Sequence, residues 1–142
     1  MWKSGILCFV ITSIMALAVH GPAVAGDVAK GEKVFKKCKA CHSLEPGKKK
    51  VGPSLHGVFG RTAGTSEGFK YSALNSAAGD SGLVWNEDAM FAYLPDPNAF
   101  LKKFLTETGK AELATGRTKM TFKLKKEDQR KDVIAFLKEN TQ

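Results

Sequence analysis

The sequence predicts a small all-α domain of four to five helices. Two observations support this: apolar residues recur at helical spacing in several segments, and the long stretch from Ser43 to Gly82 shows no convincing strand alternation. The 142 residues suit one domain, and the 43% of apolar residues is ordinary for a globular protein. The 25% of charged residues, together with nine phenylalanines, does not fit a disordered chain.

The first 25 residues have the features of a secretory signal peptide. Lys3 gives a positive start, an apolar run follows, and a small-x-small site ends at Ala25. We expect cleavage after Ala25 and a periplasmic location, which leaves residues 26–142 as one domain. The alternative is an uncleaved anchor, although the apolar run is shorter than the ~20 residues of a membrane span. Removing this segment lowers the net charge from +8 to +7 and the cysteine count from three to two.

The first helix is expected over Lys30–Cys41. Val34, Phe35 and Cys38 recur at helical spacing there, with lysines between them, and Asp27 can cap the start. Ser43 to Gly82 is rich in glycine and unusually long for a loop in a compact domain. Its aromatic residues argue against disorder, so we expect it to wrap something.

Four further helices and one loop are expected. Short helices are expected over Ser72–Ala78 and over Glu87–Leu94, the second capped by Asn86. Another helix is expected over Asn98–Leu105, a loop over Thr106–Thr118, and the last helix over Lys126–Glu139.

Residues 38–42 read C-x-x-C-H, the signature of covalent c-type haem attachment. Two cysteines three apart on a helix project to one side, so Cys38 and Cys41 can form thioethers with the two vinyl groups of one porphyrin. His42 then lies under the iron and supplies an imidazole ligand. A bound haem would also explain what the glycine-rich tract wraps.

Three other interpretations of the motif remain. A disulfide oxidoreductase normally has a strand before the motif, and none is predicted here. A structural zinc site needs about four ligands, and only His56 and carboxylates are available beyond the motif. A plain disulfide would close a very small loop and stabilise little.

The sixth iron ligand has several candidates: Met120, Met90, His56, water or none. Met90 lies on a predicted helix in the setting of a core methionine, and His56 is interpreted as a surface or packing histidine. Met120 lies among lysines after a polar loop, where an apolar residue is explained by ligation. A His/Met pair raises the reduction potential and leaves no site for substrate, which predicts an electron carrier and not an enzyme.

Several further segments resemble one known family. They are Gly31 and Phe35, Val51 to Arg61, Phe69 to Ser72, Trp85, Tyr93-Leu94, Pro97, Thr118 to Met120, and Val133 to Leu137. With the haem motif they make the chain resemble the class I c-type cytochromes, most closely the bacterial cytochrome c2 type. The stretch Leu101–Gly116 is longer than in the shortest members, which leaves its path open.

The resemblance implies a role for each matching residue. It implies that His42 and Met120 are the axial ligands of one covalent haem c and its iron, and that the Pro53 carbonyl accepts from the His42 ring. It implies that a buried propionate is held by Arg61, Tyr71 and Trp85. It implies that the methionine side of the haem is surrounded by Asn75, Tyr93 and Thr118. It also implies that Gly31 lets the first and last helices cross closely against Phe136.

The lysines cluster on both sides of these motifs. An exported chain without a nucleic-acid motif is not expected to bind nucleic acid, so we expect a positive ring that steers a monomeric carrier to acidic surfaces. The resemblance implies transient contact with membrane complexes: a bc1 complex as donor, and a terminal oxidase or photosynthetic reaction centre as acceptor. The alternative function is a ligand-binding haem protein with a labile Met120.

Overall fold

The computed structural model describes residues 26–142, so the signal-peptide interpretation of residues 1–25 lies outside the described residues. In chain order the helices are α1 (Val28–Phe35), α2 (Ala73–Asp80), α3 (Glu87–Tyr93), α4 (Pro97–Glu107), the 3₁₀ helix η1 (Ala111–Leu113) and α5 (Glu127–Asn140). In this part of the chain, β-type pairing is limited to one isolated bridge between Thr62 and Val84. The all-α prediction is confirmed.

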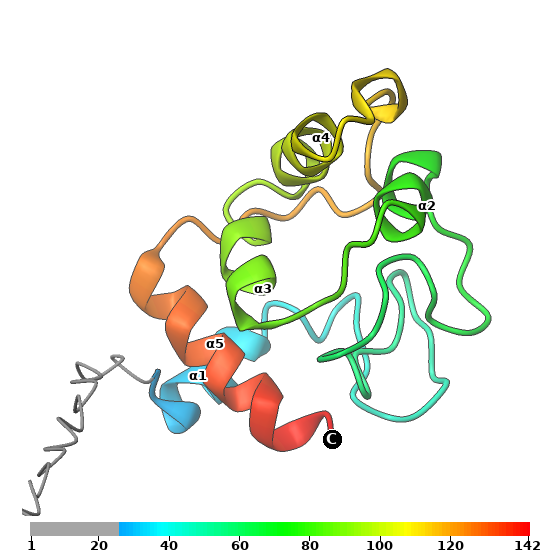
Figure 1. Cartoon of the computed structure of the whole chain (residues 1–142). Coiled ribbons are helices and arrows are strands. Elements are labelled where there is room, and N and C mark those ends of the chain that lie inside the picture. The colour runs from blue at the N-terminus through cyan, green and yellow to red at the C-terminus, as the bar shows by residue number, and fades with distance from the viewer. Residues whose placement is uncertain (1–25) are drawn as a thin grey trace, which may run out of the picture.

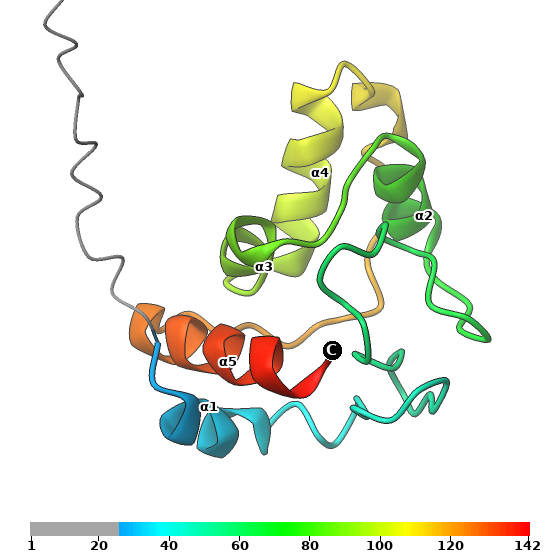
Figure 2. The same ribbon diagram turned by 60° about the horizontal axis from the view of Figure 1, so that its bottom comes forward.

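Helices α1 and α5 lie side by side, as both ribbon views show (Figures 1 and 2). Their close approach depends on Gly31, because a Cβ atom there would lie 2.0 Å from the Asp132 carbonyl oxygen and 2.7 Å from the Phe136 Cβ. One turn further along α1, the rings of Phe35 and Phe136 are 5.2 Å apart. The expected close crossing of the first and last helices is confirmed.

Helices α2, α3 and α4 form the other half of the molecule (Figure 2). Asn86 caps α3 as predicted, with its side-chain oxygen accepting from the Ala89 N–H. Aromatic rings hold this half together: Tyr93 lies 4.8 Å from Trp85 and 5.8 Å from Phe100, both edge to face. None of the helices between residues 26 and 142 combines the length and the apolar character needed to cross a membrane.

The backbone of the glycine-rich tract is hydrogen-bonded to the segment between α2 and α3. The Gly60 N–H donates to the Trp85 carbonyl, and the Ala63 N–H donates to the Leu83 carbonyl, each at 2.8 Å. Gly57 and Gly60 have positive φ angles of 61° and 86°, which a residue with a side chain adopts only at a cost. The tract is therefore an ordered wrap, as expected from its aromatic content.

The prediction of a first helix over Lys30–Cys41 is wrong in its second half. Helix α1 ends at Phe35, and the chain continues in tighter turns, with the Cys38 N–H donating to the Phe35 carbonyl at 2.8 Å. The periodicity of the sequence continues past this point, but Cys38 and His42 turn inward to line a cavity. Tertiary packing here overrides the local helical preference.

A Gly31→Ala substitution tests the close crossing of α1 and α5. Helix propensity alone would make this change stabilising by about 0.5–1 kcal/mol. We expect the opposite, a loss of about 1–3 kcal/mol in the free energy of unfolding, because the added methyl group meets the α5 backbone. Denaturant unfolding measures it, with Glu32→Ala on the exposed face of α1 as the control. A stabilised Gly31→Ala variant would contradict the packing.

Candidate functional site: an apolar cavity with a C-x-x-C-H motif at its wall

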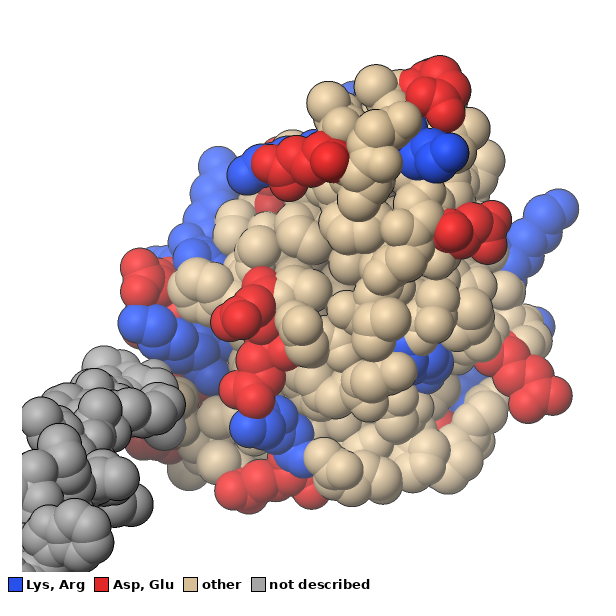
Figure 3. Space-filling model, viewed as in Figure 1, with Lys and Arg blue, Asp and Glu red and all other residues tan. Residues whose placement is uncertain are grey.

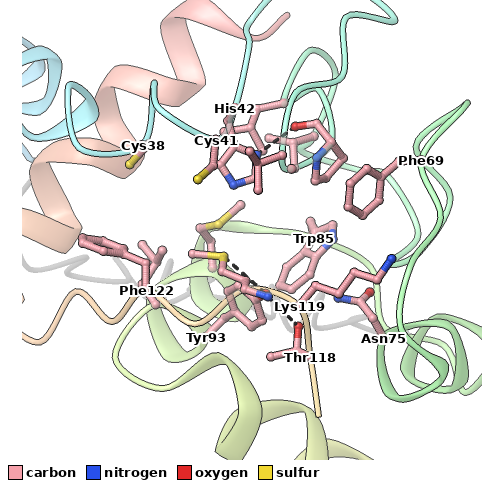
Figure 4. Close-up of a pocket in the computed structure, with 18 of the residues that line it drawn as sticks. Cys38, Cys41, His42, Phe69, Asn75, Trp85, Tyr93, Thr118, Lys119 and Phe122 are labelled. Atoms are coloured by element: carbon pink, nitrogen blue, oxygen red, sulfur yellow. Dashed lines mark hydrogen bonds between the residues drawn. The ribbon is translucent and has the colours of Figure 1, made fainter.

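A cavity of about 230 Å³ lies between the two halves of the molecule (Figure 4). Its walls come from the turn after α1, the glycine-rich tract, α3, α5 and the segment 118–122. Close-packed protein interiors have few voids larger than a water molecule, so this space is not a packing defect. Its predominantly apolar wall is suited to a large apolar group.

The C-x-x-C-H motif forms one wall of this cavity. Cys38 is half-buried, Cys41 is exposed, and both line the cavity together with His42. The two thiols are not joined in a disulfide. Burial raises the pKa of the Cys38 thiol to about 11, unlike the lowered pKa of the reactive cysteine in disulfide oxidoreductases.

Two features hold the His42 ring in a single orientation. Its Nδ1 atom lies 2.8 Å from the Pro53 carbonyl oxygen. A carbonyl can only accept, so Nδ1 carries the proton and Nε2 keeps the lone pair that a metal needs. Gly52 packs against the ring, since a Cβ there would lie 2.6 Å from Cε1 of His42. Burial lowers the pKa of His42, which favours the neutral imidazole.

The opposite wall carries Tyr93 and Thr118, which face His42 across the cavity (Figure 4). The Tyr93 hydroxyl donates to the Met120 Sδ at 3.5 Å, and the Met120 N–H donates to the Thr118 Oγ1 at 3.4 Å. Burial raises the pKa of Tyr93 to about 12, so the hydroxyl stays protonated at neutral pH. The Met120 sulfur is thus held on the wall facing His42.

The other two ligand candidates differ in position. His56 is half-buried and is not among the residues that line the cavity. Met90 is only 6% exposed and belongs to the core, as expected, yet it also lines the cavity. The sequence named Met90 as a candidate but assigned it to the core, and did not predict that its thioether lines the cavity; Met120 differs from it in being half-buried and in accepting a hydrogen bond from Tyr93.

Arg61, Tyr71 and Trp85 all line the cavity, and the Trp85 backbone N–H donates to the Arg61 carbonyl at 2.9 Å. The Arg61 guanidinium donates to the carbonyls of Ser54 and His56, each at 3.0 Å. It forms no ion pair with a carboxylate within residues 26–142, and burial lowers its pKa. A half-buried cation without a counter-ion favours an anionic group beside it.

One buried polar atom also indicates a missing partner. Asn75 lines the cavity and is 7% exposed, and its Oδ1 atom has no hydrogen-bond partner. Buried polar atoms normally have one, so a bound group or water completes this wall. The described part of the chain contains no group of three or more His, Cys, Asp or Glu side chains suited to a metal ion by itself. A covalent haem, with propionates near Arg61, fits these residues.

Two exposed residues at the mouth of the cavity were given no functional role by the sequence predictions. Val51 is 77% exposed and Phe122 is 40% exposed, and both line the cavity. Nothing in a linear pattern distinguishes them from ordinary surface residues, because their role depends on the segments that meet there. They make part of the rim apolar.

Comparisons with known proteins identify the family of this chain. The cytochrome c family matches residues 28–141. The chain is 61% identical over 115 residues to cytochrome c2 iso-2 of Rhodospirillum centenum, which covers 80% of this chain and 95% of that protein. It is 61% identical over 111 residues to a cytochrome c2 of Rhodopseudomonas palustris, which covers 78% and 96%.

Solved structures give the same result. A cytochrome c2 structure from Rhodospirillum centenum matches with a TM-score of 0.80 at 59% identity, over 82% of this chain and all of that one. The ferricytochrome c2 structure from Rhodopseudomonas palustris matches with a TM-score of 0.77 at 59% identity, over 80% and 98%. The protein carries a covalent haem c and is an electron carrier between membrane complexes, not an enzyme. The chain thus belongs to the cytochrome c family, as a class I c-type cytochrome of the cytochrome c2 type.

Proposed function

We propose that this protein carries single electrons through a haem whose iron is held by His42 and Met120 and whose vinyl groups are bonded to Cys38 and Cys41. The observation that carries this assignment is the pair of oriented side chains across one apolar cavity. His42 is oriented by Pro53 at 2.8 Å, and Met120 is oriented by Tyr93 at 3.5 Å.

The chemistry follows from the two ligand types. When bound, a haem with one imidazole and one thioether ligand exchanges a single electron at a raised potential, because the soft sulfur favours Fe(II). Tyr93 donates to the same sulfur, which leaves the second sulfur lone pair available to a bound iron. With both axial positions supplied by the protein, no position is open to a substrate.

We assign the binding of a haem propionate, which is anionic, to Arg61, Tyr71 and Trp85. Arg61 is held by two backbone carbonyls and supplies the positive charge, while Trp85 is 8% exposed and shields this group from water. Asn75, Tyr93 and Thr118 surround the methionine side, where the free Asn75 Oδ1 needs a donor.

We further propose that part of the lysine set steers the protein to its partners. Lys36 and Lys39 lie in or beside the motif turn, are exposed, and form no ion pair within residues 26–142. Lys50 and Lys119 are less free, since they donate to the Lys39 and Lys70 carbonyls. On the face in Figure 3, acidic and basic side chains border a wide uncharged area, so this face carries no continuous basic tract.

The partners that fit are membrane complexes with acidic docking surfaces. A bc1 complex as donor and a terminal oxidase or photosynthetic reaction centre as acceptor meet this requirement. The exposed Val51 and Phe122 at the mouth supply apolar contact within the charged surroundings. Such a complex is brief and sensitive to salt, as an electron shuttle requires.

The periplasmic location of the cytochrome c2 type requires export. We propose that residues 1–25 are the signal peptide and that cleavage after Ala25 releases a monomer starting at Gly26. The Asp27 N–H donates to the Asp132 carboxylate at 2.8 Å, so the chain is anchored to α5 two residues after this site.

Met120→Ala tests the axial assignment. We expect the oxidised protein to lose its weak near-infrared sulfur-to-iron band, to bind carbon monoxide when reduced, and to fall in potential by on the order of 100 mV. The matched control is Met90→Leu, which removes the other thioether of the cavity. Retention of the band in Met120→Ala with its loss in Met90→Leu would reverse the assignment. A high-spin spectrum in the unmodified oxidised protein would favour the ligand-binding alternative.

Lys36→Gln and Lys39→Gln test the steering charge. We expect each to slow electron transfer to isolated membranes about two- to fivefold at low ionic strength, with the difference vanishing at high salt. Lys103→Gln is the control, because Lys103 is already paired with Glu107 at 3.6 Å on α4. Equal slowing by all three variants would mean that net charge, and not this surface, sets the rate.

A further inference from the structure

The segment that carries Met120 is held in place by residues that are distant from it in the sequence. It runs from Thr118 to Leu124 and has no regular secondary structure. It follows the long stretch Leu101–Gly116, which includes most of α4 and all of η1. The entropic cost of closing such a connection grows with its length, so the segment needs contacts that hold it against the cavity.

Those contacts come from the junction of α3 and α4, which we call the clamp and define as Leu94–Asn98. The Leu124 N–H donates to the Leu94 carbonyl at 2.8 Å. Lys123 forms an ion pair with the Asp96 carboxylate. The Thr118 N–H donates to the Asn98 Oδ1 at 3.1 Å, across twenty positions of the chain.

The clamp holds the segment at both ends, on either side of Met120. The contact of Asn98 lies two residues before Met120, at Thr118. The contacts of Asp96 and Leu94 lie three and four residues after Met120. Asp96 uses its two carboxylate oxygens separately: Oδ1 accepts from the Ala99 N–H and caps α4, and Oδ2 pairs with Lys123. The start of α4 and the ligand segment are therefore fastened through one side chain.

We propose that Asp96 and Asn98 are positioning residues for Met120, and that the clamp sets how readily an outside ligand displaces the Met120 sulfur from the iron. The proposal rests on Met120 being the axial ligand. The Asn98–Thr118 and Asp96–Lys123 contacts differ in environment. Thr118 is 8% exposed, whereas both side chains of the Asp96–Lys123 pair are exposed. Only the ion pair is weakened by salt.

The test is the affinity of the oxidised holoprotein for imidazole, followed by loss of the near-infrared band. Asp96→Asn keeps the α4 cap, because asparagine caps as well as aspartate, but removes the ion pair. We expect its imidazole affinity to rise about two- to fivefold at low salt, the range of one exposed ion pair. The unmodified protein should approach the same affinity in high salt.

Asn98→Ala removes the acceptor of the Thr118 N–H. We expect a rise in imidazole affinity of about fivefold or more, because a nearly buried donor loses its partner, and this rise should persist in high salt. Asn98→Asp keeps an acceptor oxygen and should restore most of the original affinity. Lys103→Gln, which breaks an exposed ion pair within α4, is the control and should leave the affinity unchanged.

Global stability is measured in parallel by denaturant unfolding followed by far-ultraviolet circular dichroism. Variants that lose stability but bind imidazole as the unmodified protein does would overturn the proposal, since a merely structural role predicts that result. Met120→Ala marks the upper limit of the effect. If it does not raise the affinity, the axial assignment itself fails; if it does while Asp96→Asn and Asn98→Ala do not, only the clamp fails.

Discussion

The structure depends on one apolar cavity that its own side chains leave unfilled. A chain of this size buries a modest core, and here the described helices surround a space of about 230 Å³ instead of closing on one another. The close crossing of α1 and α5 at Gly31 forms one side of the enclosure, and the aromatic cluster around Trp85 forms another. The covalent haem of this family therefore acts as part of the core, which ties folding to the functional site.

The two walls that face each other are built in different ways. The His42 wall is local: Cys38, Cys41 and His42 lie within five residues, and Pro53 is eleven positions away. The Met120 wall is assembled from distant parts of the chain, since Tyr93 is 27 positions away and the clamp lies at the junction of α3 and α4. Local attachment makes the histidine side robust, whereas the methionine side depends on long-range contacts that substitutions can weaken separately.

Charge and apolar surface have separate roles at the cavity mouth. Several lysines are held by ion pairs or by backbone carbonyls, such as Lys119 by the Lys70 carbonyl. They still contribute to the net charge of +8, but they are less free to pair directly with a partner. Val51 and Phe122 expose apolar surface beside the motif. Long-range attraction and short-range contact thus come from different residues, which allows fast association without a tight complex.

The sequence by itself determined the chemistry and most of the helices. C-x-x-C-H is a local pattern whose spacing is enough to indicate haem attachment, and caps such as Asn86 mark helix starts through hydrogen bonds within three residues. Tertiary structure decided what depends on contacts between distant segments. Helix α1 ends at Phe35 because the motif must turn inward, and Met90, which periodicity assigned to the core, also reaches the cavity. The clamp pairs residues twenty or more positions apart. Periodicity and spacing report on neighbours along the chain, so they cannot show which distant backbone or side chain completes a wall.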